Sequence, residues 1–429
     1  MKALILTSLL LAFAVAAQAQ QPAAPETSPQ VEALQQQVKE LQERLIALEG
    51  QVRMLKAQAA PPAPAAAQAP ATPPAATGPA APGVAVGQAT RLGGAASLAK
   101  ALNPDISMIG NFFGSIGGNS PPPGASQRTF PSLEMHESEL GLQAVIDPYA
   151  RGDFFLSFGE EGVGLEEGYI TFTALPAGFV GRVGKMRAAF GKVNTMHTHM
   201  LPWTDRPLMT DNLVAGEEGI SDAGVSLTRS FAGPKDLFLE ATGQVFRGDS
   251  GDERHPLFTA SRRSDVSMVA HLRGYKDITE STNLDIGVSF ARGHNELGSN
   301  FLTKLYGVDA TLRWKPLRRS IYRSFLARSE FVWSQRQQEE LTRRAFGFYA
   351  SADYQFSRRW FIGARYDTSD RAGVAGTDHG TSAALSFWPS EFSQLRWQYR
   401  STRFAEGRNA NELLMQVQFV LGAHGAHPF

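Results

Sequence analysis

The chain contains no cysteine, so an exported form of it cannot be a small domain held by disulfides. Beyond its first nineteen residues it has no run of eighteen apolar residues, and this excludes a membrane-spanning helix. It also lacks an excess of either charge, since 41 Lys and Arg stand against 41 Asp and Glu. This balance gives no electrostatic reason to expect a nucleic-acid partner.

Catalytic signatures are missing as well. The sequence has no Gly-x-Ser-x-Gly, no His-Glu-x-x-His and no phosphate-binding glycine loop. We therefore expect neither an enzyme nor a bound cofactor. What remains open is a β-barrel, because barrel strands alternate lipid-facing and lumen-facing residues and never form a long apolar run.

The first residues have the three parts of a secretory signal. Lys2 supplies the positive charge, Ala3 to Val15 the apolar stretch, and Ala17-Gln18-Ala19 a small-x-small cleavage site. The apolar stretch is shorter than the ~20 residues that a spanning helix needs. Residues 1–19 are therefore predicted to be a cleaved signal peptide.

A coiled-coil stalk is predicted next, over residues 28–58, because apolar residues fill every a and d position of four heptads. They are Val31, Leu34, Val38, Leu41, Leu45, Leu48, Val52 and Leu55. The alternative is a single amphipathic helix on a surface, which would be marginally stable alone. Residues 59–103 are rich in Pro, Ala and Gly and are predicted to be an extended linker, because they cannot bury a core.

From residue 104 to 429 the sequence alternates apolar with polar or small residues, as in Leu284 to Phe290 and Leu413 to Phe419. Aromatic residues flank the short turns, where they would suit a membrane interface. The pattern predicts an all-β fold, an antiparallel transmembrane barrel of about sixteen strands. The predicted strands are 105–116, 131–146, 151–158, 165–175, 179–189, 220–231, 237–247, 265–275, 282–292, 301–314, 323–334, 344–356, 359–367, 379–388, 393–403 and 411–421.

The connections are predicted to alternate between short turns at the periplasmic end and longer polar loops after the first, fifth, seventh, ninth, eleventh and thirteenth strands. This places both chain ends, and with them the stalk, in the periplasm.

Two features resemble known outer-membrane proteins. The last alternating strand, followed by the terminal Phe429, looks like the C-terminal signature of Gram-negative outer-membrane barrels. Residues 181–191 and 203–208 are similar to a region of the phosphate-selective porin family. The resemblance covers roughly residues 105–429 and implies a sixteen-stranded trimeric porin with a coiled coil before the barrel. The dense Arg and Lys array of that family's phosphate-selective members is absent, because acids and bases are mixed here.

The longest loop, from about 190 to 219, is the candidate constriction, since loops of this length in compact folds are often functional. Its charged candidates are Asp205, Arg206, Asp211, Glu217 and Glu218. The alternative is a loop lying outside on the rim.

Facing this loop, the polar phase of the late strands carries Arg359, Arg365, Arg396 and Arg400, and the last three are called the wall arginines below. Acids of the polar phase on other strands are Glu137, Glu139, Asp153, Glu167, Glu240, Asp285, Asp309 and Asp353. Arginines opposite an acidic loop would set a transverse field across a pore, whereas the alternative is a set of solvated residues paired for stability. His197 and His199 are weak candidates for a metal, because no Cys and no nearby carboxylate completes a site in the sequence, and His424 and His427 are similarly weak.

Together these features predict an outer-membrane porin for passive diffusion of small hydrophilic solutes, anions included. Its partners would be membrane lipid, two further copies in a homotrimer, and the cell wall through the stalk. Two alternatives stay open: a structural tether between outer membrane and cell wall, and an uptake protein specific for a metal- or phosphate-related substrate.

Overall fold

The computed structural model describes residues 104–118, 121–160, 162–251 and 256–422. The predicted signal peptide, stalk and linker lie outside these residues and stay predictions. Seventeen strands form one antiparallel sheet. They are β1 (Asp105–Gly117), β2 (Leu133–Met135), β3 (Ser138–Asp147), β4 (Ala150–Gly159), β5 (Gly162–Phe172), β6 (Phe179–Arg187), β7 (Ser221–Ala232), β8 (Phe238–Phe246), β9 (Ser267–Thr279), β10 (Thr282–Asn295), β11 (Gly298–Trp314), β12 (Ser324–Gln337), β13 (Thr342–Ser357), β14 (Trp360–Asp370), β15 (Thr377–Ser390), β16 (Ser393–Arg403) and β17 (Asn409–Gly422).

The sheet closes on itself. Each long strand pairs with its neighbours in sequence, and β1 pairs with β17 from Ser107↔Gly422 to Gly117↔Glu412. The three residues of β2 pair with β1 next to the stretch of β1 that pairs with β3, so β2 and β3 together occupy one position in the barrel. The prediction of an antiparallel barrel of sixteen strands is therefore confirmed. The strand predicted at 131–146 is interrupted at His136 and Glu137, where the register along β1 slips by one residue.

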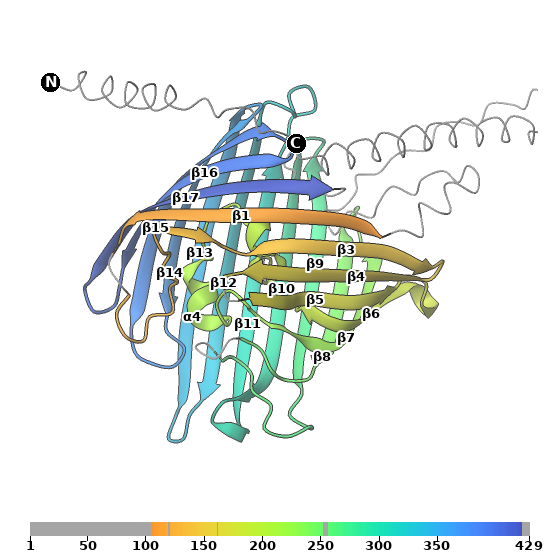
Figure 1. Cartoon of the computed structure of the whole chain (residues 1–429). Coiled ribbons are helices and arrows are strands. Elements are labelled where there is room, and N and C mark those ends of the chain that lie inside the picture. Colours follow the sequence, from red (N-terminus) through yellow and green to blue (C-terminus); the bar gives the residue numbers. More distant parts are fainter. Residues whose placement is uncertain (1–103, 119–120, 161, 252–255, 423–429) are drawn as a thin grey trace, which may run out of the picture. The chain divides into compact units, whose positions relative to one another are not determined.

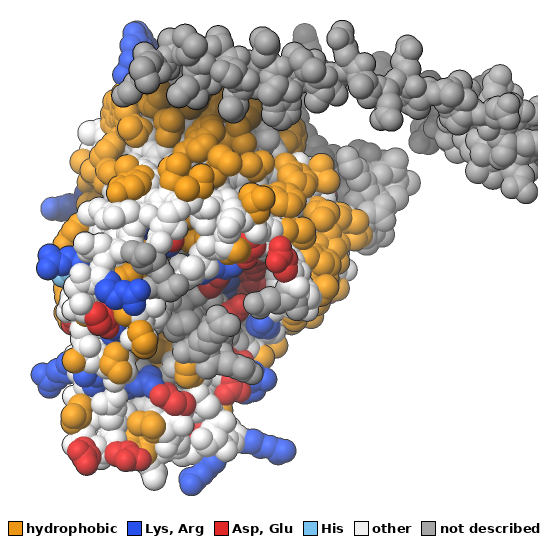
Figure 2. Space-filling view, turned by 60° about the vertical axis from the view of Figure 1, so that its left-hand side comes forward, with side chains coloured by type: hydrophobic (Ala, Val, Ile, Leu, Met, Phe, Trp, Pro, Cys, Tyr) orange, Lys and Arg blue, Asp and Glu red, His pale blue; other side chains and the backbone are white. Residues whose placement is uncertain are grey.

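Alternation decides which side chains face outward. In β17, Leu413, Met415 and Val417 are exposed, whereas Gln416 and Gln418 between them are buried. Apolar side chains therefore cover the outside of the barrel, and polar ones turn inward. In Figure 2 hydrophobic side chains gather over the upper part of one face, and charged side chains are more frequent below them.

Short turns follow β3, β7, β9, β13 and β15 at one end of the barrel. At the other end three of the expected long loops are shorter than predicted, because β10, β12 and β14 continue past their apolar stretch. They leave connections of two, four and six residues. Continued pairing satisfies backbone groups even where the side chains are polar, so the end of the apolar alternation does not mark the end of a strand.

Not all of the aromatic residues that flank the short turns face outward, as a position at the membrane interface would require. Trp388 was expected at the membrane interface, but it is buried with Ile109 and Val420. It shares the inward phase of β15 with Ser386 and Ser382. The mistake arose because proximity to a turn does not determine which face of a strand a residue occupies.

The segment between β6 and β7, residues 188–220, is called the lumen loop here. It contains three short helices, η2 (Val193–Thr195), η3 (Thr198–Met200) and α4 (Leu208–Leu213). Figure 1 draws α4 among the strands, and this helix contacts β12, β13, β14 and β15. The loop therefore lies within the barrel. No helix in the described part of the chain is long and apolar enough to cross a membrane.

Packing holds the lumen loop as much as polar contacts do. Phe190, Leu201, Trp203 and Met209 of the loop belong to one buried cluster with inward side chains of the wall. The Trp203 and Tyr349 rings meet edge to face, with their centroids 5.2 Å apart. Burying each large side chain stabilises such a cluster by roughly 1.5–3 kcal/mol.

Candidate functional site

Asp205 fastens the middle of the lumen loop to the barrel wall. Its Oδ2 accepts hydrogen bonds from Arg365 Nη2 at 2.9 Å and from Arg400 Nη1 at 3.1 Å. Its Oδ1 accepts one from Gln398 Nε2 at 2.6 Å. Burial alone raises the pKa of this carboxyl, but the two guanidinium groups outweigh it and hold the pKa of Asp205 below its usual value. Asp205 is therefore a buried carboxylate with two cationic partners.

The wall arginines do not share the same partners. Arg365 also donates to Asp367 at 2.8 Å, and Arg400 to Glu412 at 2.8 Å through Nε. Arg396 instead donates to neutral groups, namely the Trp203 carbonyl and the side chains of Gln416 and Ser386. The structure thus brings Arg365 and Arg400 into direct contact with the acidic loop rather than across a gap from it.

Asp211 and Arg206 lie in the interior of the lumen loop. Burial, reinforced by the nearby Asp205 charge, raises the pKa of Asp211 well above its usual value. Arg206 donates to the backbone carbonyls of Val193 and Met196 at 3.1 and 2.9 Å. Burial first, and then the like charge of Arg187, lowers the pKa of Arg206 to about 10, which leaves it charged. Arg206 therefore stabilises the fold of the loop itself.

Glu217 forms a second attachment, to the segment between β1 and β3. Its carboxylate contacts Arg128, and His136 Nε2 lies 2.9 Å from its Oε1. Burial lowers the pKa of His136, but its hydrogen bonds with Glu134 and Glu217 outweigh this and raise it above the usual value. Glu218 is exposed, and its backbone carbonyl accepts a hydrogen bond from Arg187 Nη1 at 3.0 Å.

A third attachment, to β10 and β12, holds the start of the lumen loop. Lys192 Nζ lies 2.9 Å from Asp285 Oδ2, and the Val193 amide donates to Glu330 Oε1 at 2.8 Å. Gly191 has a positive φ of 61°, and a side chain at this position would collide with Glu330. The close approach of loop and wall therefore requires glycine here.

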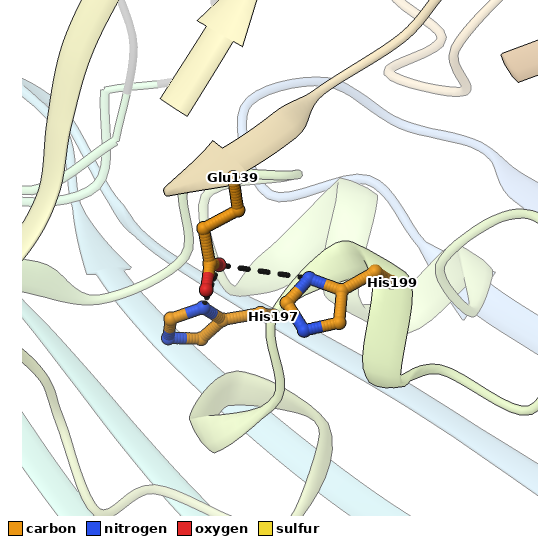
Figure 3. A group of neighbouring side chains, drawn as sticks. All are labelled: Glu139, His197 and His199. Carbon is orange, nitrogen blue, oxygen red and sulfur yellow. Dashed lines mark hydrogen bonds and ion pairs between the residues drawn. The ribbon is translucent and has the colours of Figure 1, made fainter. Parts of the chain in front are cut away.

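His197 and His199 meet acidic residues of two strands, as Figure 3 shows for Glu139. His197 Nδ1 contacts Glu139 Oε2, and His197 Nε2 lies 2.8 Å from Glu167 Oε2. His199 Nδ1 is 3.5 Å from the same Glu139 oxygen. Burial lowers the pKa of His197, but the hydrogen bonds with Glu139 and Glu167 outweigh it and raise this pKa to about 10. The carboxylates missing around these histidines in the sequence are thus supplied by β3 and β5.

A small cavity of about 20 Å³ lies among these attachments. This is room for roughly one water molecule. Its lining comes from the lumen loop and from the segment before β2, and consists of Arg128, Phe130, Thr198, Leu201, Thr204, Asp205, Arg206, Asp211 and Glu217. Four of the charged loop residues singled out from the sequence therefore surround one space, and Glu218 does not.

No family model matches this chain. It is 28% identical over 388 residues to an uncharacterized protein of Aquifex aeolicus (strain VF5), covering 77% of this chain and 81% of that protein. The barrel resembles OprB of Pseudomonas putida at 9% identity, with a TM-score of 0.52, 76% of this chain and 95% of that one.

Two further solved structures have the same architecture. An anion-selective porin from Comamonas acidovorans matches with a TM-score of 0.51 and 10% identity, over 74% of this chain and 99% of that one. The outer membrane channel DcaP of Acinetobacter baumannii matches with a TM-score of 0.50 and 12% identity, over 74% and 96%. At these identities the likeness concerns the fold.

Several residues of the site were not found from the sequence. Arg128, His136 and Gln398 carry no local signal for their contacts with the lumen loop, since their partners in that loop lie 81 or more residues away. Glu166 was missed because strict alternation assigns it to the outside of β5. A register shift between Phe155 and Leu156 on the neighbouring strand marks a β-bulge here, so both Glu166 and Glu167 are buried.

Proposed function

We propose that this chain is an outer-membrane porin through which small hydrophilic solutes diffuse passively. The observation that carries the proposal is the lumen loop, which lies inside a closed barrel and is attached to the wall by charged side chains. A sixteen-stranded barrel is wide enough to enclose an aqueous path, and an internal loop determines how wide that path is.

An apolar exterior and a polar interior support a position in the lipid of the outer membrane. The solved structures with a similar fold point the same way, because they include an anion-selective porin and an outer membrane channel. These similarities do not support membership of the phosphate-selective porin family, and neither do the mixed charges of the lumen.

The charges around Asp205 favour a mild preference for anions. The three wall arginines and Arg206 lie near four carboxyl groups, those of Asp205, Asp367, Glu412 and Asp211. Burial raises the pKa of Asp211, which reduces the negative charge that this acid contributes. Fixed positive charge along a narrow aqueous path raises the local concentration of anions.

Planar-bilayer recording of the purified full chain tests this function. Wild type should insert in discrete conductance steps, and a variant that lacks residues 195–212 should conduct more, because the deletion removes α4 and the Asp205 attachment. A barrel that folds but shows no steps in either form would contradict the porin proposal and favour the tether. Equal conductance of the two forms would remove the lumen loop from the permeation path.

A homotrimer is the assembly that we propose, with the stalk standing in the periplasm. The stalk has Leu at all four d positions and no buried Asn to impose a dimer, although these heptads also suit two strands. Threefold symmetry of the barrels would let three stalks meet on one axis. Contact with the cell wall through the stalk belongs to this proposal.

A further inference from the structure

The lumen loop and two strands of the wall bring together five residues of two metal-ligating types, His and Glu. This histidine–glutamate cluster consists of Glu139 of β3, Glu166 and Glu167 of β5, and His197 and His199 of the loop. One donor atom each of Glu139, His197 and His199 lies within 4.8 Å of the other two, and Glu139 is among the most buried acids of the wall. Porin function assigns no role to this cluster.

His197 has the surroundings of a metal-bound imidazole. Metal-ligating histidines almost always donate their second ring N–H to a carboxylate or carbonyl, which orients the ring and leaves the other nitrogen for the ion. Here Glu167 Oε2 lies 2.8 Å from His197 Nε2. The other oxygen of Glu167 accepts the Arg187 backbone amide at 2.6 Å, so the carboxylate is itself fixed. His197 Nδ1 therefore points to the remaining acids.

Glu166 provides the independent observation. The β-bulge turns it inward although the alternation of β5 would place it in lipid, and only 5% of the residue is exposed. Arg187 Nη2 donates to its Oε1 at 2.6 Å. Its Oε2 has no hydrogen-bond partner and lies 3.5 Å from His197 Nδ1. A buried carboxylate oxygen without a donor is costly, and a cation beside it would remove that cost.

We propose that this cluster binds a divalent transition-metal ion of the zinc class, with Glu139, His197 and His199 as ligands and Glu166 Oε2 or water in the fourth position. The three glutamates exceed the single guanidinium of Arg187 by two negative charges, which a divalent ion balances. Imidazole ligands favour zinc and its neighbours over Mg²⁺ or Ca²⁺, which prefer oxygen alone.

The spacing of the donors fits such an ion with little rearrangement. Zinc binds nitrogen and oxygen at about 2.0–2.2 Å, so tetrahedral ligand atoms lie roughly 3.4 Å from one another. Both the His199 Nδ1–Glu139 Oε2 and the His197 Nδ1–Glu166 Oε2 distances are 3.5 Å. The direct contact between His197 and Glu139 has to open, because these two atoms lie closer together than two ligands of one ion. An ion at this position would link the lumen loop to β3 and β5.

Metal titration of the purified full chain in detergent, without a histidine tag and after chelator treatment, tests the site. Zn²⁺ is measured by competition with a chromophoric chelator, and Co²⁺ by its visible absorption. We expect one ion per chain with micromolar or tighter affinity, and the intense Co²⁺ bands of a four-coordinate nitrogen–oxygen site. H199Q and E139Q should abolish this binding, and E167Q should weaken it by about 10- to 100-fold.

His379→Gln is the matched control, because His379 is an exposed imidazole of β15 outside the cluster, and this variant should bind like wild type. Absence of saturable binding to wild type would overturn the proposal, as would binding retained in H199Q. Loss of binding in H136Q but not in H199Q would also overturn it, because the ion would then occupy the separate group of His136, Glu137 and Glu217.

If the ligand variants fail to form a barrel, the wild-type Co²⁺ spectrum decides, since the weak bands of an octahedral oxygen site would contradict histidine ligation. These measurements involve no conductance. Their failure is therefore distinguishable from a failure of the porin proposal.

Discussion

Replacing Asp205 by Asn removes one charge and little volume from the centre of the lumen loop. Arg365 and Arg400 would each lose their bond to Asp205 Oδ2, while Gln398 could still donate to an amide oxygen. Removing one partner from a buried ion pair costs about 3–5 kcal/mol, because the other charge stays buried without compensation. This corresponds to a factor of about 10² to 10⁴ in the equilibrium constant between the attached and the released loop.

Two measurements follow from this change. The midpoint of urea unfolding should fall, and the reversal potential at low salt should shift toward anions, because the substitution removes one negative charge. Asp205 carries a depressed pKa, so its contribution is present above the usual pKa of a free Asp. It is lost only as the pH falls through the lower folded value. The comparison therefore belongs at neutral pH.

Asp211→Asn is the matched control, since it makes the same chemical change six residues away. Burial raises the pKa of Asp211, so this acid carries less negative charge than Asp205, and its replacement should change both the midpoint and the reversal potential less than D205N does. Wild-type behaviour of D205N would refute the anchoring role of Asp205. An equal effect of D211N would show that side-chain shape, not charge, holds the loop.

Three further results are expected. Changing all three wall arginines to Gln leaves three carboxylates unpaired, so the reversal potential at low salt should move toward cation preference; an unchanged potential would place these side chains off the permeation path. The His136–Glu217 contact stabilises the loop fully below pH 6.5 and is lost as the pH rises through the raised folded pKa of His136. The conductance of wild type should therefore increase toward alkaline pH, and H136Q should lose this pH dependence. A synthetic peptide of residues 28–58 should sediment as a helical trimer, and its variant with Leu41 and Leu48 changed to Asp as an unfolded monomer; a monomeric wild-type peptide would exclude a self-associating stalk.

The barrel was predictable because alternation is a local property of each strand. Period-2 segments such as Leu413 to Phe419 identify a strand and its faces with no knowledge of its partners. The length of the segment between β6 and β7 likewise singled out the loop that lies inside the barrel. The phase of β14 and β16 correctly turned Arg365, Arg396 and Arg400 inward, where they are buried.

Contacts across the lumen were not predictable, because they depend on the path of the loop after it enters the barrel. Asp205 and Arg400 are 195 residues apart, and His197 and Glu139 are 58 apart. Their meeting is determined by strand tilt and loop packing, which leave no trace in the local pattern. Nor did the pattern reveal the interruption at His136, where one strand of the prediction becomes two.

The bulge at Glu166 gives β5 a change of parity. Before it the outward residues have odd numbers, Val163 and Leu165, and after it they have even numbers, Ile170 and Phe172. In an ordinary barrel strand the loss of one residue moves every following side chain to the opposite face of the sheet, so lipid-facing residues turn to the lumen and lumen-facing residues to the lipid. In β5 the loss of either Glu166 or Glu167 would instead restore a regular strand and invert no other residue. This strand can therefore gain or lose an internal carboxylate by a single-codon deletion or insertion, a route to a new lumen chemistry that leaves the lipid-facing surface untouched.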